Sequence, residues 1–279
     1  MKNRLLPKID RKYEGDTVAK RLVKARLVRL MQSATNVHLL LKPLQEHMYY
    51  EGSVISEAED DDQLLANMVK EYASSDTIPP KFVACKELLN SFLKLPGPEG
   101  KVIVWSNFIH NIDSLSNYLK TQGIHNEVLY GATPVETERD QDGMKTREQI
   151  ITGFHDAQSP HKVIIANPYA VGESISLHHA CRNAIYLDRN YNATPFIQSK
   201  DRIHRYGLGK DAKVNYHYLV SKDSIDLAIH EALAYKEERM QMLIESEEIL
   251  LFKVYKNEEE EFNADIAELI RIYHAEQHS

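Results

Sequence analysis

Residues 183–205 read NAIYLDRNYNATPFIQSKDRIHR, an apolar run followed by a polar loop and a helix-like segment. The run 183–187 has the length and apolar content of a buried strand, and Asp188 follows it directly. Pro195 suits the first turn of a helix, which we predict over 195–205. That helix would carry Arg202 and Arg205 one turn apart. Because strand–helix units of this kind build parallel sheets, the stretch already favours an α/β fold.

Strand and helix patterns alternate on both sides of this stretch, from residue 101 onward. Besides 183–187 and 195–205, we predict strands over 102–105, 127–130, 162–166 and 213–220 and helices over 109–121 and 144–155. Such alternation predicts a parallel sheet with helices on both faces. Ligands of these folds bind outside the carboxyl ends of the strands. We therefore expect the loops that follow strand ends to gather on one edge: Ser106–Phe108, Gly131, Asn167–Pro168 and Asp188.

Arg202 and Arg205 by themselves leave two interpretations open. An arginine pair at this spacing usually forms a solvated helix face or contacts a nearby acid such as Asp201. Paired guanidinium groups also supply the positive charge that phosphoryl transfer requires around the γ-phosphate. The strands and loops around the pair favour the second interpretation.

Five segments in chain order resemble motifs IV to VI of superfamily-two helicases, specifically of the Swi/Snf-like branch. They are Trp105–Phe108, Leu129–Thr133, Gly172–Leu177, Asp188–Pro195 and Gln198–Gly207. The resemblance is strong over residues 100–230 and weaker over 17–40, which are similar to the helix preceding the second lobe. It implies a RecA-like three-layer domain with a parallel sheet and helical N-terminal and C-terminal extensions. The expected parts are a helical segment 1–97, a RecA-like lobe 98–222, and a helical brace with an acidic tail 223–279.

The resemblance also implies a role for each motif, since in that family the second lobe closes on a first lobe that holds ATP and Mg²⁺. Catalytic roles fall on Arg202 and Arg205, which act on ATP, and on Gln198, which couples the nucleotide to lobe closure. Cofactor contacts are implied for Gly172, Glu173, Ser174 and Asp188. Contacts to the backbone of double-stranded DNA are implied for Ser106, Asn107, Gly131, Thr133, Asn167 and Asn192.

The chain departs from the family pattern at several motif positions. Ser174 and Ser176 stand where Gly and Asn are common, and Tyr191-Asn192-Ala193 replaces the usual Trp-Asn-Pro. Motif IV is Trp-Ser-Asn-Phe, where Phe-Ser-Gln-Phe is usual. The general role is retained, but chromatin remodelling is not implied. The motif VI pattern resembles the DNA-translocating branch more than the Gly-Arg form of RNA helicases, which disfavours an RNA helicase lobe.

Two nucleotide-binding signatures are absent from the sequence. It contains no Gly-x-x-x-x-Gly-Lys-Ser/Thr and no Asp-Glu pair after an apolar strand. We therefore expect the phosphate cradle and the magnesium ligands to belong to a first lobe, in the same or another chain, and this chain alone to be inactive. The alternative is a non-catalytic module that binds protein or DNA without ATP.

Composition limits the remaining classes. The chain has 279 residues, 43% of them hydrophobic, and a net charge of −7, yet residues 1–50 carry 11 Lys and Arg against 4 Asp and Glu. A local basic surface for nucleic acid and a solvated helix face remain equally open for that region. Cys85 and Cys181 lie far apart, and the spacing of the histidines, His178-His179 included, does not predict a metal site. Neither a membrane span nor a signal peptide is expected, so the predicted location is the cytoplasm.

Overall fold

The structure is a computed structural model that describes residues 17–41, 63–75, 77–135, 145–169, 175–205, 207–209, 212–245, 266–267 and 269–273. Its α-helices are α1 (Thr17–Thr35), α2 (Gln63–Ser74), α3 (Pro80–Phe92), α4 (Ile109–Thr121), α5 (Arg147–His155), α6 (Ala193–Lys200) and α7 (Ile225–Glu245). Two 3₁₀ helices are η3 (Val37–Leu41) and η5 (Gly97–Gly100). The strands are β1 (Val102–Trp105), β2 (Glu127–Leu129), β3 (Val163–Ala166), β4 (Asn183–Tyr186) and β5 (Asn215–Tyr218).

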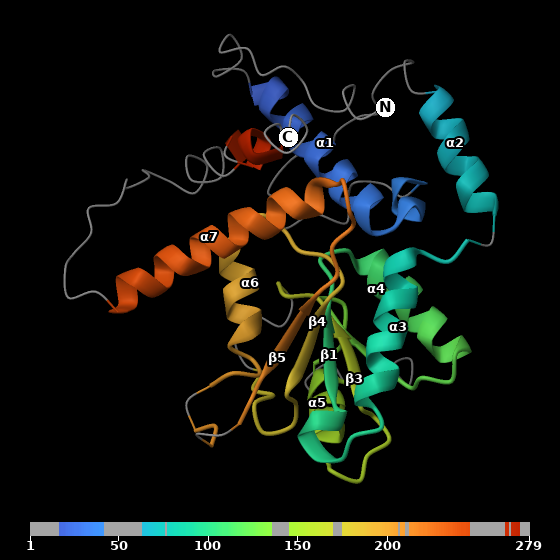
Figure 1. Cartoon of the computed structure of the whole chain (residues 1–279). Coiled ribbons are helices and arrows are strands. Elements are labelled where there is room, and N and C mark those ends of the chain that lie inside the picture. The colour runs from blue at the N-terminus through green and yellow to red at the C-terminus, as the bar shows by residue number, and fades with distance from the viewer. Residues whose placement is uncertain are drawn as a thin grey trace.

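The five strands form one parallel sheet in the order β2-β3-β1-β4-β5 (Figure 1). The central strand β1 pairs on both sides, with Val102 opposite Val163 of β3 and opposite Asn183 of β4. All four residues of β1 are buried, as are those of β3 and β4. Unbroken apolar runs are what a sheet covered on both faces requires. The predicted α/β, RecA-like class is therefore confirmed.

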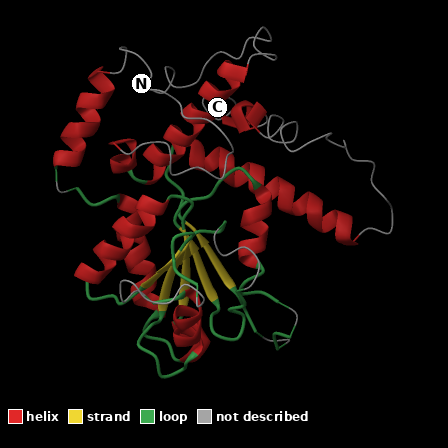
Figure 2. Cartoon of the chain, turned by 180° about the vertical axis from the view of Figure 1, so that it is seen from behind, coloured by secondary structure: helices red, strands yellow, loops and turns green. Residues whose placement is uncertain are grey.

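Helices cover both faces of the sheet, as the view from behind also shows (Figure 2). On one face, α3 and α4 supply Phe82 and Ile112 to a cluster with Val102 and Val104 of β1. The other face carries Ile103 and Trp105 into a second cluster. Its helical members come from α5, α6, α7 and α1, and include Phe154, Phe196, Ile229 and Leu27. Alternate residues of each strand thus serve two separate apolar layers, which gives the three-layer arrangement.

The segments outside the sheet also pack on this second cluster. Leu27 and Leu30 of α1, Ile229 and Leu233 of α7, and Leu269 near the C-terminus are all buried in it. Ser221 Oγ, just before α7, donates to the carbonyl of Ala34 in α1 over 2.6 Å. The division of the chain at 97/98 and 222/223 stays a prediction, because both extensions share their apolar contacts with the lobe.

The element boundaries differ from the sequence-based ones at several ends. The helix predicted from 144 begins at Arg147, because Thr146 accepts from Gln149 N while the Gln149 side chain accepts from Thr146 N, a reciprocal cap. The helix predicted over 195–205 begins at Ala193 and ends at Lys200. Asn192 caps its start by accepting a hydrogen bond from Thr194 N. The expected N-cap at Asp16 lies outside the described residues.

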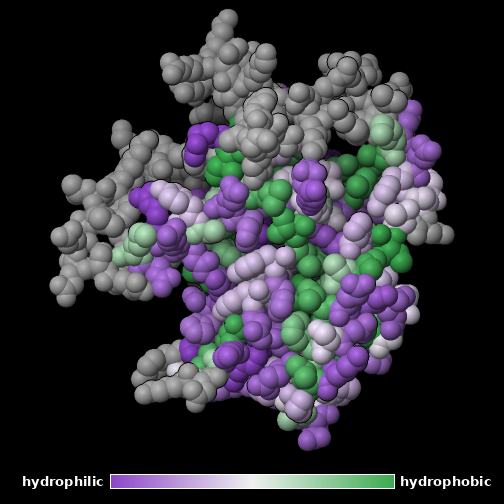
Figure 3. Space-filling model, in the orientation of Figure 1, coloured by the Kyte–Doolittle hydropathy of each residue, from purple (hydrophilic) through white to green (hydrophobic). Residues whose placement is uncertain are grey.

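The surface is mixed in character (Figure 3). In that view, hydrophilic residues cover much of the described side near α7, and hydrophobic ones gather toward α2 and α3. Leu41, Met68 and Ile78, which lie in η3, in α2 and just before α3, are exposed large hydrophobic side chains. Within the described ranges, no helix has both the length and the apolar character needed to cross a membrane.

Candidate functional site

The carboxyl edge of the sheet is organised around the side chain of Asp188, which follows β4. Ser106 Oγ, just after β1, donates to Asp188 Oδ2 over 2.5 Å. Asn107 donates to Asp188 Oδ1 with its backbone N over 2.7 Å and with its side-chain Nδ2 over 2.9 Å. The loops after β1 and β4 are thereby tied together, which confirms that these strand-end residues gather on one edge.

Two further asparagines, Asn111 and Asn36, extend the hydrogen bonds around Asp188. Asn111 Nδ2, in α4, lies 3.3 Å from Asp188 Oδ2, and Asn36 Nδ2, after α1, donates to Asn111 Oδ1 over 3.1 Å. Burial raises the pKa of Asp188 above its ordinary value, although the hydrogen bonds from Ser106 and Asn107 lower it in opposition. Both carboxylate oxygens already accept hydrogen bonds from the protein. Asp188 is therefore arranged to hold the loops together, and its predicted contact with a cofactor finds no support in its contacts.

The residues predicted to bind nucleic acid divide into buried and accessible ones. Ser106, Asn167 and Thr133 are buried. Asn167 Nδ2 donates to the carbonyl of Asn107 over 2.9 Å, and Thr133 Oγ1 accepts from Tyr130 N over 3.0 Å. Their side chains therefore shape the edge and offer little surface of their own. The accessible members are Asn107 and Asn192, which are half-buried, and Gly131, which is exposed.

The two arginines of motif VI occupy different environments. Contrary to the sequence-based expectation, they do not share a helix, because α6 ends at Lys200 and hydrogen-bonded turns follow. The Arg202 carbonyl accepts a hydrogen bond from Leu177 N over 2.8 Å. This bond joins motif VI to motif V and is not a hydrogen bond within a helix. The Arg202 side chain is buried, with Nη1 3.5 Å from the carbonyl of Ile175. Arg205 and Gln198 are exposed.

Arg205 lies beside a group of other basic side chains. Burial lowers the pKa of His178, and the nearby charges of His179, Arg205, Arg182 and His155 lower it further. The rings of His178 and His179 are 3.8 Å apart, centroid to centroid. The surroundings of Arg205 thus favour an anion.

Three predicted cofactor contacts, Gly172, Glu173 and Ser174, lie outside the described residues. Among the described residues, no group of three or more His, Cys, Asp or Glu side chains is arranged to hold a metal ion. Of the two motif VI arginines, only Arg205 is exposed and can reach a nucleotide, and the described residues contain no ligand set for magnesium.

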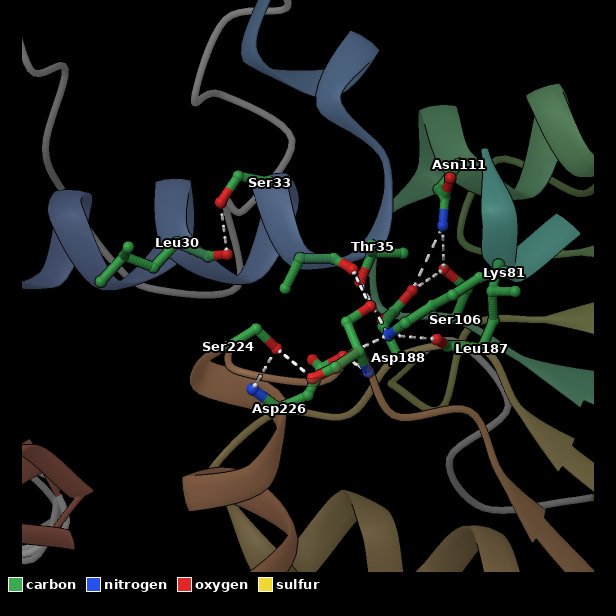
Figure 4. Close-up of polar contacts among 12 residues, drawn as sticks. Leu30, Ser33, Thr35, Lys81, Ser106, Asn111, Leu187, Asp188, Ser224 and Asp226 are labelled. Carbon is green, nitrogen blue, oxygen red and sulfur yellow. Dashed lines mark hydrogen bonds and ion pairs between the residues drawn. The ribbon is translucent and has the colours of Figure 1, made fainter. Parts of the chain in front are cut away.

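A buried ion pair joins the helices to this edge (Figure 4). Lys81 Nζ, in the first turn of α3, lies 2.6 Å from Asp226 Oδ2 in α7 and donates to the carbonyl of Leu187 over 3.0 Å. Its distance to Thr35 Oγ1, at the end of α1, is 3.4 Å. Lys81 thus links α1, α3 and α7 to the residue that precedes Asp188.

Sequence reasoning missed several members of this site. Lys81 gave no signal, since a lysine at a helix start is normally solvated. Asn111 and Asn36 lie in none of the motifs, and their distance from Asp188 in the sequence does not indicate that the three residues are in contact. Arg189 is buried among aromatic side chains at the same edge. In the sequence, its position directly after Asp188 was the feature that could have identified it as part of the site.

Comparison with known proteins agrees with this geometry. Residues 81–207 match the helicase conserved C-terminal domain. The chain is 31% identical over 139 residues to the ATP-dependent helicase fft1 of Schizosaccharomyces pombe and 32% identical over 152 residues to the ATP-dependent helicase FUN30 of Saccharomyces cerevisiae. These matches cover 50% and 54% of this chain, but only 13% and 12% of the two relatives.

A solved structure shares the fold. The crystal structure of the C-terminal part of the Fun30 ATPase domain has a TM-score of 0.52 and 21% sequence identity, over 98% of this chain and 86% of that one. The matched region begins at Lys81 and ends at Gly207, and so includes the Asp188 network and both arginines of motif VI. Residues 81–207 are therefore similar to the helicase conserved C-terminal domain, and the relatives that this chain resembles over about half of its own length are ATP-dependent helicases.

Proposed function

We propose that this chain is the second RecA-like lobe of an ATP-dependent DNA translocase or helicase, and that it completes the nucleotide site of a first lobe. Arg205 supplies transition-state charge to the γ-phosphate. Arg202 holds motif V against motif VI, and Gln198 couples the nucleotide to lobe closure. The carboxyl edge contacts the DNA backbone, and ATP and Mg²⁺ are held mainly by the first lobe.

The observation that carries this proposal is the contrast between the two arginines. Arg202 is buried against the Ile175 carbonyl, whereas Arg205 is exposed beside His178. An arginine that acts on a nucleotide held by another lobe must be exposed in the isolated lobe, since its ligand arrives from outside. An arginine that only stabilises the fold, as Arg202 does, can be buried.

The test joins the chain to the first lobe of its motor and measures DNA-stimulated ATP hydrolysis. Arg205→Ala is expected to reduce the rate by about 100-fold or more, because removal of a finger removes charge that is effective only in the transition state. Arg239→Ala, in the exposed part of α7, is the matched control and should leave the rate unchanged. A wild-type rate for Arg205→Ala would exclude the finger role.

The absence of a P-loop keeps one alternative in view, a module that binds DNA or protein without ATP. The same experiment separates the two. If the joined protein binds DNA but hydrolyses ATP no faster than the first lobe alone, the interaction module is the correct description.

A further inference from the structure

Arg189 is a buried cation with no anionic partner of its own. It follows Asp188, and the residue is only 8% exposed. The guanidinium carbon lies 4.4 Å from the ring centroid of Tyr218 and 5.9 Å from that of Phe196. Among the described residues, it makes no hydrogen bond or ion pair. The acid whose charge influences it, Asp226, is paired with Lys81.

The aromatic contacts fix the guanidinium group without using its donors. The guanidinium carbon lies over the Tyr218 ring, and a cation–π contact of this kind uses none of the N–H donors, so they remain available to a ligand. Burial lowers the pKa of Arg189, which means that the surroundings disfavour the isolated charge. A buried charge is stabilised when an opposite charge pairs with it. An anion that binds beside Arg189 would therefore stabilise its charge.

The hollow that Arg189 lines is small. The space inside it is about 10 Å³, and Asn107, Asn190 and Asn192 contribute to its wall. One water-sized atom needs about 10–15 Å³. The hollow therefore admits a single ligand oxygen, such as one oxygen of a phosphate group, and excludes a complete nucleotide.

The one acid in this wall does not oppose such a ligand strongly. Asp188 lines the hollow, but Ser106, Asn107 and Asn111 donate to both of its oxygens. Asn192 uses Oδ1 as the cap of α6, which leaves its Nδ2 group as a donor. The side chains around Arg189 can therefore add donors to its charge.

We propose that Arg189 and this hollow bind one phosphodiester group of a DNA strand. The inference rests on the proposed function, which brings DNA to the carboxyl edge, and it adds a charged residue to the asparagines there. A phosphate accepts two parallel N–H bonds from a guanidinium group, and the cation–π contact leaves these donors available.

The experiment measures binding of a labelled DNA duplex to the full chain by fluorescence anisotropy between 50 and 200 mM salt. Arg189→Met removes the charge and keeps an apolar side chain against the rings. We expect roughly tenfold weaker binding and a salt slope reduced by about 1, as for one lost phosphate contact. Arg239→Met removes a charge from an exposed position of α7 and should retain the salt slope of the wild type.

The outcomes separate this inference from the proposed function. If the wild-type chain binds no DNA, both fail. If it binds and Arg189→Met binds with the same affinity and slope, only the Arg189 site fails. ATP is titrated in parallel, and a variant that loses affinity for ATP but not for DNA would also overturn the inference.

A purely structural role is tested by thermal unfolding and by Arg189→Lys. Removal of an uncompensated buried charge should leave the Tm of Arg189→Met unchanged or raised, and saturating DNA should raise it less than in the wild type. A lower Tm with an unchanged gain from DNA would identify a structural arginine. Arg189→Lys keeps the charge and should keep the salt slope with weaker affinity, and a slope equal to that of the methionine variant would contradict the site.

Discussion

Asp188 shows how one buried carboxylate can organise the carboxyl edge of a sheet. Its two oxygens accept hydrogen bonds from Ser106, Asn107 and Asn111, and all three donors lie in or near segments that follow β1. Because the acid is buried, these donors have no water to replace it. The position of the motif IV loop therefore depends on the charge at the end of β4.

Removal of the Asp188 carboxylate should lower the free energy of unfolding. Asp188→Ala leaves several buried donors unsatisfied, and we expect the free energy of unfolding to fall by about 3 kcal/mol. Asp188→Asn keeps one acceptor oxygen and should lose less. Urea unfolding of the two variants measures the difference. A change below about 0.5 kcal/mol for the alanine variant would show that the network does not hold the edge.

His178 reports on the position of Arg205. Burial and the charges of His179, Arg205, Arg182 and His155 lower its pKa below the ordinary 6.5. The unfolded chain therefore binds this proton more readily, so stability is complete above about pH 6.5 and falls as the pH drops below it. Arg205→Ala removes one lowering charge and should move the pKa upward. NMR titration of the His178 ring checks this, and an unchanged midpoint would place Arg205 away from it.

At the scale of elements, the ion pair of Lys81 and Asp226 links α3 and α7 at the carboxyl edge of the sheet. The pair is buried and joins α3 to α7, while Lys81 also reaches the Leu187 carbonyl and Thr35 (Figure 4). Ser221 N donates to the same Asp226 carboxylate over 2.9 Å. The start of the proposed brace helix is thus set by one lysine.

A broken buried pair leaves an uncompensated charge, so Lys81→Met should lower the free energy of unfolding by about 3–5 kcal/mol. Asp226→Asn, added to Lys81→Met, neutralises the remaining acid and should recover a substantial part of the loss. Denaturant unfolding of the single and double variants forms the cycle. Equal losses in the single and double variants would mean that the charges are not coupled.

Two of the central strands were predictable from the sequence because each is a short apolar run. The 102–105 and 163–166 segments are buried on both faces, and burial of that kind is directly visible as an absence of polar residues. The C-terminal end of α6 was not predictable. The bond from Leu177 N to the Arg202 carbonyl joins residues from different motifs, and local propensity contains no information about it.

The candidate site was predictable only in part, for the same reason. Motif order and strand ends pointed to Asn107, Asp188 and Arg205. The burial of Lys81 and of Arg189 depends on partners that lie far away in the sequence, Asp226 and Tyr218. Charged residues in such positions look like solvated ones until the fold brings their neighbours together.

At the scale of the whole molecule, the lobe combines a hydrogen-bonded carboxyl edge with an exposed arginine in motif VI, Arg205. Ser106, Asn107, Asn167 and Asp188, which follow β1, β3 and β4, are joined by hydrogen bonds, whereas Arg205 is exposed. Under the proposed function, the lobe acts when a second surface brings the nucleotide to Arg205. The chain by itself should therefore bind DNA and leave ATP unhydrolysed.

The most direct measurement determines kcat and KM for ATP in the joined two-lobe protein, with saturating DNA, for wild type and Arg205→Ala. The account predicts that kcat falls by about 100-fold or more while KM changes little, because a finger acts on the transition state and not on ground-state binding. A wild-type kcat would contradict it, as would a loss confined to KM.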